Sequence, residues 1–276
     1  MTRPVIVFDR MALGALIIGA LLGMVVLADQ ISPQGPIQQD LSFSLFSPSQ
    51  FHPFGTDALG RDVLARVFYG ARVSVPVAVF ATLLSTFIGT LFGLMSGASG
   101  RVADHLLMRV VDVALAFPTL VLLLVLASLY RSNHPVHLIA LLGLTTWMPM
   151  ARLVRAETLS LSRQPFVEAA TGLGAGPVQR ALRHLLPNVA STILVTATLL
   201  VGETMLMESG LSYLGLGVAA PTPSWGDMIR QGMPNLHDAW WVATFPGVVL
   251  ATAVIAFNLL GDGLRDALDP RRSTPA

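Results

Sequence analysis

The residues able to do chemistry are concentrated in two short stretches of a chain that is otherwise mostly apolar. Two carboxylates, Glu203 and Glu208, fall within or directly after the apolar run 189–207. Ionisable groups in such a run usually face a bundle interior or an aqueous cavity and mark a transport pathway. The second stretch, residues 163–188, is polar and rich in arginine. It cannot lie in lipid, so it faces water and is free to contact another protein.

The pathway candidates also have simpler interpretations. Glu208 could sit at the outer interface of the membrane, which leaves Glu203 as the better candidate. Met205 and Met207 could form a soft, adaptable lining, or they could be packing or lipid-facing methionines. We predict a translocation pathway that includes Glu203, Met205, Met207 and Glu208, and we keep these alternatives open.

What the chain lacks excludes several kinds of chemistry. All 17 basic residues are arginine, and the sequence contains neither lysine nor cysteine. Without a P-loop lysine the chain cannot itself be a P-loop ATPase. Schiff-base catalysis, thiol nucleophiles, disulfides and thiolate metal sites are excluded as well. We therefore expect no catalytic residue, no metal site and no cofactor bound by this chain.

The elements that must position these residues are membrane spans. Hydrophobic residues make up 53% of the chain, charged residues 12%, and the mean hydropathy is +0.67. A transmembrane helix needs roughly 20 apolar residues. The sequence predicts an all-α, polytopic protein with six such helices, of which the fourth is long enough only if it continues past Arg152. The runs are 11–28, 73–97, 110–130, 136–150, 189–207 and 240–260.

The first run could be a cleaved signal peptide, but its apolar region is long and no small-x-small cleavage site stands out before Asp29. We interpret it as a retained anchor. Residues 1–72 then comprise the anchor, an external loop and an interfacial helix capped by Asp57, although this segment could also be a plain connector. Residues 73–262 form the membrane core, and residues 263–276 form a tail.

The arginines predict the orientation of the spans, because positive charge accumulates on the cytoplasmic side. With the amino terminus inside, residues 1–10, 98–109, 151–188 and 263–276 lie in the cytoplasm and carry most of the arginines. The outer side keeps Arg61, Arg66, Arg72, Arg131 and Arg230. We therefore expect a multi-pass protein of a bacterial or archaeal plasma membrane, with both termini and the loop 163–188 in the cytoplasm.

The loop 163–188 predicts two helices joined by a turn. Pro165 suits a first helical turn, and Gly174 can adopt the positive φ that ends that helix. A second helix is expected to start at Gly176-Pro177 and to end at Pro187. Its apolar side would carry Val178, Ala181, Leu182 and Leu185, and its polar side Gln179, Arg180 and Arg183.

The same residues resemble a known family. Glu168-Ala-Ala-Thr-Gly-Leu-Gly174, followed by His184-Leu-Leu-Pro187, resembles the EAA loop of importer-type ABC permeases. Four more motifs are similar to the C-type permease subunit of dipeptide, oligopeptide and nickel importers, and they cover essentially the whole chain in order. They are Phe54-Gly-Thr-Asp-Ala-Leu-Gly-Arg-Asp62, Ser212-Tyr-Leu-Gly-Leu-Gly217, Pro221-Thr-Pro-Ser-Trp-Gly226 and Asn258-Leu-Leu-Gly-Asp-Gly-Leu-Arg-Asp-Ala-Leu-Asp-Pro-Arg271. His184 departs from the broad EAA pattern but matches its peptide-importer version.

The resemblance implies the type I ABC importer permease fold and a set of partners. A second, homologous permease would complete the pathway, two cytoplasmic ATPases using ATP and Mg would dock on the EAA loop, and an external binding protein would deliver the substrate. Small peptides are the expected substrate, with nickel or a metal chelate as the alternative. The residues that the resemblance assigns to ATPase coupling are Glu168, Ala169, Ala170, Gly174, Arg180, Arg183, His184 and Pro187.

Two other classes of function compete with this one. A self-sufficient, proton-coupled secondary transporter could use Glu203 and Glu208. An intramembrane enzyme has less support, because the sequence contains neither HExxH nor Gly-x-Ser-x-Gly. Within the loop, Glu168 could simply complement a helix dipole, and His184 could be a packed or capping residue.

Overall fold

The computed structural model describes residues 3–32, 35–130 and 134–268, and this part of the chain is helical without any strand. The predicted all-α class is therefore confirmed. Arg131, Arg271 and Arg272, and the predicted tail beyond residue 268, lie outside the described residues.

Four helical stretches are long and apolar enough to cross a membrane without a sharp break. They are α1 (Arg3–Ile31), α2 (Val63–Ala98), the stretch Pro177–Tyr213 that ends with α9 (Leu186–Tyr213), and α11 (Trp241–Leu268). These stretches correspond to the first, second, fifth and sixth predicted spans.

The third and fourth predicted spans are each broken into two helices. α3 (Arg101–Leu115) and α4 (Thr119–Leu129) meet at an angle of 79°, and α5 (Pro135–Thr145) and α6 (Met148–Leu161) meet at 43°. Pro118 lies at the first break, where it disfavours helical geometry in the residue before it. Pro149 lies in the first turn of α6. The chain has six spans if each bent pair counts as one.

The second span begins earlier than the sequence suggested. Asp62, and not Asp57, caps α2 by accepting a hydrogen bond from the backbone N–H of Ala65 at 2.8 Å. α2 then runs unbroken through the position predicted to separate an interfacial helix from the membrane core. The predicted interfacial helix is therefore the first part of α2. Asp57 instead accepts bonds from the backbone N–H groups of Leu59 and Arg61 in the turn before it.

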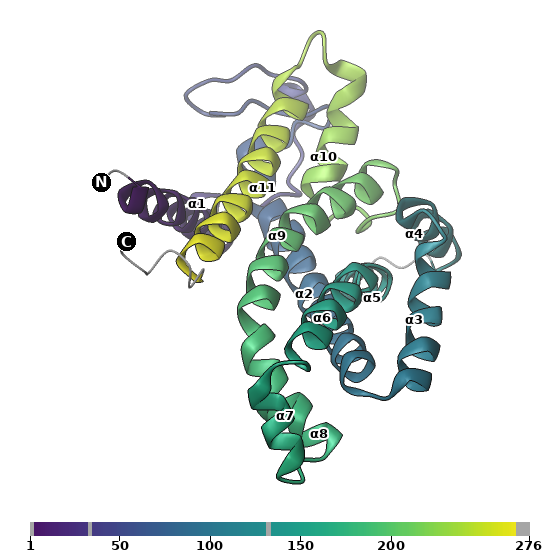
Figure 1. Cartoon of the computed structure of the whole chain (residues 1–276). Helices are drawn as coiled ribbons and strands as arrows, with labels where there is room; N and C mark the ends of the chain where they lie inside the picture. Colours follow the sequence, from purple (N-terminus) through teal and green to yellow (C-terminus); the bar gives the residue numbers. More distant parts are fainter. Residues whose placement is uncertain (1–2, 33–34, 131–133, 269–276) are drawn as a thin grey trace.

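α2 lies at the centre of the bundle, against α1, α5, α6 and α9 (Figure 1). Its contact with α6 depends on glycines spaced four residues apart, a pattern that lets two helix backbones approach closely. A Cβ atom at each of these positions would come within 2.7 Å of an α6 side chain. The facing pairs are Gly89 with Met150, Gly93 with Val154, and Gly97 with Thr158.

α1 packs across α11 at the other side of the molecule (Figure 1). A Cβ atom on Gly14 would lie 2.8 Å from both the carbonyl oxygen of Ala256 and the amide nitrogen of Leu260. Farther along α1, Asp29 accepts two hydrogen bonds from the guanidinium of Arg72, at 2.8 and 2.9 Å. The anchor helix is thus fixed to both α11 and α2.

We predict that Gly14→Ala destabilises the protein by about 1–3 kcal/mol, because the added methyl group collides with the α11 backbone. Gly19→Ala is the matched control, since a Cβ atom there meets nothing within 4 Å. Alanine is the better helix former, so the control should be neutral or gain about 0.5–1 kcal/mol. Thermal unfolding in detergent measures both, and equal melting temperatures for the two variants would contradict the described α1–α11 contact.

Candidate coupling site and polar groups of the spans

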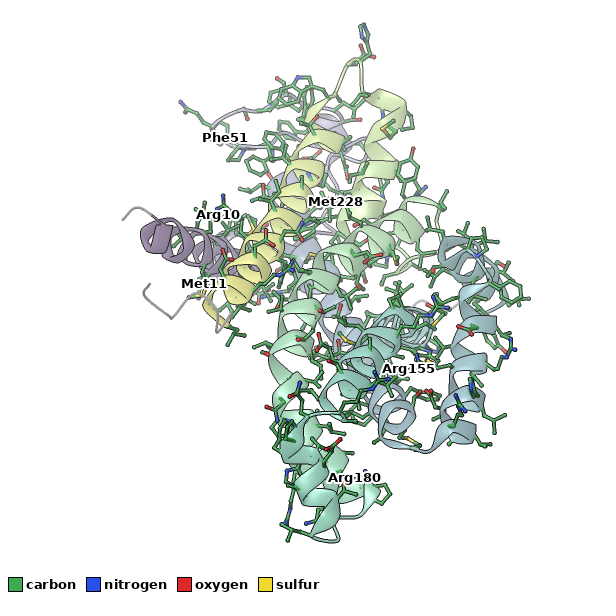
Figure 2. All side chains as sticks on the ribbon, viewed as in Figure 1. Arg10, Met11, Phe51, Arg155, Arg180 and Met228 are labelled. Carbon is green, nitrogen blue, oxygen red and sulfur yellow. The ribbon has the colours of Figure 1, made fainter. Side chains whose placement is uncertain are left out.

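The loop 163–188 forms a projecting knob at one end of the molecule, opposite the end that carries α10 (Trp225–Gly232) (Figures 1 and 2). α7 (Pro165–Gly172) starts at Pro165 as predicted and places Glu168 in its first turn. Gly174 has a φ of +89°, so it ends this helix in the left-handed conformation that the sequence suggested. α8 (Pro177–Arg180) follows directly after the turn.

The second helix of the knob does not end at Pro187, and this prediction was wrong. α8 continues through one π-helical turn, Ala181–Leu185, directly into α9. Pro187 lies in the first turn of α9, where the absence of its N–H is tolerated because the π turn already interrupts the regular bonding pattern. The knob is therefore a continuous helical extension of a membrane span.

The apolar side of the knob is divided between a packed base and an exposed tip. At the base, Val167 and Leu185 are buried in a cluster with Met150 and Val154 of α6. At the tip, Leu173 is 90% exposed, and Val178 and Leu182 are also exposed. Apolar side chains presented together on a water-facing, well-formed element mark a protein interaction surface.

The residues assigned to coupling do not all face outward. Glu168, Ala169, Gly174, Arg183 and Pro187 are exposed, whereas Ala170, Arg180 and His184 are half-buried. Arg180 turns back toward its own subunit: its Nη1 donates to Thr171 Oγ1 at 3.4 Å, and it lines a cavity of about 240 Å³ beside Gly97–Gly100. The predicted shared basic face of Arg180 and Arg183 is therefore split.

α6 leads into the knob and is tied to α3 by two ion pairs. Arg155 donates two hydrogen bonds to the carboxylate of Asp104, at 2.6 and 2.7 Å, and Ser96 donates a third. Arg152 pairs with Asp112 at 2.7 Å, but both side chains of that pair are about half exposed. Together with the glycine contact to α2, these bonds bind the helix preceding the knob to two neighbours.

Glu208 is completely buried inside the bundle. Its side chain has no exposed surface, and it accepts hydrogen bonds from Ser212 at 2.7 Å and from Ser209 at 3.4 Å. Ser74 of α2 lies beside this carboxyl group, and its hydroxyl accepts the backbone N–H of Trp225 at 3.3 Å. The carboxyl group of Glu208 is therefore buried where α9 meets α2 and the start of α10.

The other pathway candidates lie in different surroundings. Glu203 is exposed on the surface of α9, Met207 is half-buried, and Met205 is fully buried in a core cluster with Val75 and Trp225. The four residues do not line one common surface of this chain. Of the two carboxylates, only that of Glu203 is open to a partner or to water.

A buried charged network at the α10 end was not predicted from the sequence. Asp57 pairs with Arg61 at 2.6 Å and with Arg66 at 3.5 Å, and all three side chains are nearly inaccessible. Arg61 also donates to Gln231 at 2.7 Å, and Gln231 donates to Asp227 of α10. The segment before α2 is thereby joined to α10 across 170 residues of sequence.

The fold and these sites define a class: a helical membrane protein with several spans and, at one end, a projecting knob with exposed apolar side chains. Residues 89–274 match the family described as the inner membrane component of binding-protein-dependent transport systems, and the chain belongs to this family. The chain is 39% identical over 259 residues to the dipeptide transport system permease protein DppC of Bacillus subtilis, covering 94% of this chain and 81% of that protein.

Two further relatives agree with the family. A Brucella suis protein provisionally named as a peptide permease is 46% identical over 243 residues, which are 87% of this chain and 80% of the relative. The oligopeptide transport system permease protein OppC of Bacillus subtilis is 39% identical over 258 residues, which are 94% of this chain and 84% of the relative.

We predict that the ion pair between Asp104 and Arg155 contributes more to stability than the pair between Asp112 and Arg152. A double-mutant cycle with alanine should give a coupling energy of about 1–2 kcal/mol for the first pair, which is bidentate and mostly buried. The exposed second pair should give roughly 0–1 kcal/mol. Unfolding in detergent measures both cycles, and a larger coupling in the exposed pair would contradict the tie between α6 and α3.

Proposed function

We propose that this chain is the permease subunit of an ATP-driven importer of small peptides and that it forms half of the translocation pathway. The observation that supports this most strongly is the knob, whose exposed apolar tip is continuous in helix with the membrane span α9. A protein that binds the tip and changes shape can displace α9 directly. The relatives with 94% coverage of this chain are named for dipeptide and oligopeptide transport, so nickel is not favoured as the substrate.

The partners in this proposal follow from the family and the absent lysine. Two cytoplasmic ATPases dock on the knob and hydrolyse ATP with Mg, because this chain has no P-loop lysine and binds neither ligand itself. A second, homologous permease completes the pathway, and an external binding protein delivers the peptide. The knob and both termini face the cytoplasm, and the α10 end faces outward, in agreement with the distribution of arginines.

Glu203 is the residue of α9 that we assign to the pathway. Its carboxylate is exposed within an apolar span, where contact with lipid would be costly. Contact with the second permease, or with water in the pathway between the two subunits, avoids the free-energy cost of placing this carboxylate in lipid.

The self-sufficient secondary transporter makes a different prediction. That function would use Glu203 or the buried Glu208 to move protons, so the purified chain alone would transport without ATP. Proteoliposomes containing this chain alone, and others containing the complete complex, distinguish the two functions. Peptide uptake that requires the ATPases and ATP supports the importer, whereas uptake by the chain alone would replace it.

In the complete reconstituted complex, we predict that Gly174→Ala reduces peptide uptake at least severalfold and leaves the subunit in the membrane. A side chain at a φ of +89° costs about 1–2 kcal/mol, which distorts the turn between α7 and α8.

Gly172→Ala is the matched control, because Gly172 is also in open space but has an ordinary helical conformation. Uptake by this variant should stay close to that of the wild type. Equal uptake by Gly174→Ala and Gly172→Ala would mean that the shape of the turn does not matter for coupling.

A further inference from the structure

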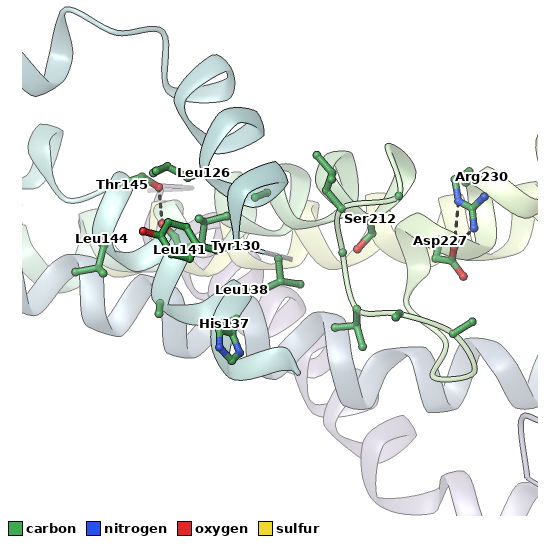
Figure 3. A pocket seen from close by; sticks show the side chains of 18 residues that line it. Leu126, Tyr130, His137, Leu138, Leu141, Leu144, Thr145, Ser212, Asp227 and Arg230 are labelled. Atoms are coloured by element: carbon green, nitrogen blue, oxygen red, sulfur yellow. Dashed lines mark hydrogen bonds and ion pairs between the residues drawn. The ribbon is translucent and has the colours of Figure 1, made fainter. Parts of the chain in front are cut away.

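A cavity of about 580 Å³ lies between α4, α5, the loop 215–220 and α10 (Figure 3). Sites for small organic molecules typically measure about 300–1,000 Å³ and combine apolar walls with a few polar groups. The cavity extends along α5 from His137 to Thr145 and reaches the end of α4, which the predicted orientation places toward the outside. No part of the proposed function described so far uses it.

The wall and one end of the cavity differ in chemistry. Leu126, Leu138, Leu141 and Leu144 provide an apolar wall on α4 and α5, while Asp227 and Arg230 of α10 lie at the other end (Figure 3). Ser212 lies on the α9 side between these groups. The cavity therefore offers an apolar surface and both signs of charge.

The charged pair is held in place and still has binding capacity. Arg230 donates to Asp227 Oδ1 from Nε at 3.1 Å and from Nη2 at 2.5 Å. A guanidinium has five N–H donors, so donors remain for a second carboxylate, and 47% of the Arg230 side chain is exposed. Asp227 is only 10% exposed and also accepts a hydrogen bond from Gln231, which fixes its orientation.

Contacts of Trp225 and Glu208 hold in place the elements around the ion pair of Asp227 and Arg230. Trp225 is fully buried, and its indole N–H donates to the carbonyl of Val67 at 3.0 Å, which anchors the start of α10 on α2. On the opposite side, Ser212 is held by its hydrogen bond to Glu208. A side chain at Gly217 would collide with Ser212, so the loop 215–220 lies directly on α9.

We propose that this cavity holds a small zwitterionic peptide during its passage. The peptide α-carboxylate binds the guanidinium of Arg230, the α-ammonium group lies beside Asp227, and the side chains pack on the leucine wall. This assignment rests on the proposed function and adds to it a site on this chain. A bare metal ion suits the cavity less well, because the described residues contain no group of three or more metal-binding side chains.

The absence of cysteine from the chain allows a direct test of occupancy. Leu126→Cys places a single thiol on the cavity wall, and Val125→Cys places one on the neighbouring residue, which is 50% exposed and does not line the cavity. The complete complex, turning over ATP in proteoliposomes, is treated with a maleimide in the presence of alanyl-phenylalanine. Labelling of the cavity thiol should slow roughly tenfold at peptide concentrations about ten times Kd, and labelling of the control thiol should not change.

A second experiment tests the charged end with Arg230→Gln. The Michaelis constant for uptake of alanyl-phenylalanine should rise roughly tenfold to a hundredfold, as expected for the loss of a charge-assisted hydrogen bond. Uptake of the same peptide with an amidated carboxyl end should be weak in the wild type and unchanged in the variant.

The outcomes separate the two proposals. Two results would overturn the cavity site and leave the importer intact. The first is peptide uptake by the wild type without slower labelling of the cavity thiol. The second is an equal change in the uptake of the free and the amidated peptide in Arg230→Gln. Slower labelling by detergent or lipid alone would identify the cavity as an acyl-chain site instead. Failure of the wild-type complex to import any peptide would overturn both proposals.

Discussion

The structure depends on one constraint: a polar group within an apolar span has no water to bind and must find its partners inside the protein. Glu208 meets this constraint with the hydroxyl groups of Ser209 and Ser212. Asp57, which is buried just before the second span, is likewise paired with Arg61 and Arg66. Ser209 and Ser212 lie on the same helix as Glu208, whereas the pair of Asp57 with Arg66 joins the segment before α2 to α2 itself and so also fixes the position of an element. Glu203 differs from Glu208, since its carboxylate is exposed on α9.

A series of helix contacts connects the knob with the membrane spans. The knob is continuous with α9 on one side, and on the other side it follows α6, which is packed on the glycines of α2 and paired with α3. α3 in turn leads through a bend of 79° into α4, one wall of the cavity. The knob is therefore connected to α4 and to the cavity through a short series of adjoining helices.

Hydropathy and local turn chemistry predicted much of this architecture. Four of the six apolar runs, the start of α7 at Pro165 and the positive φ of Gly174 follow from short-range rules and agree with the structure, and the other two runs are each bent into two helices. Proline was the least reliable signal, because its effect depends on context: Pro187 begins a turn of α9 instead of ending a helix, and Pro118 breaks a span. The burial of Glu208, Arg61 and Arg66 was not predicted, since it depends on elements that pack together from distant parts of the sequence; Arg61, for example, bonds to Gln231, 170 residues away. The glycines that face α6 at four-residue spacing are a pattern visible in the sequence that indicates close helix packing, and it was not among the predictions.

In the proposed function, the knob contacts the ATPase and the opposite end of the molecule does not. Leu173 at the tip of the knob is 90% exposed and Phe51 at the other end is 89% exposed, so single cysteines at these two positions are equally accessible. In the assembled complex, a photoactivatable thiol reagent on Leu173→Cys should crosslink to an ATPase subunit, and the same reagent on Phe51→Cys should not. An ATPase crosslink from Phe51→Cys, or none from Leu173→Cys in a complex that hydrolyses ATP, would contradict the account.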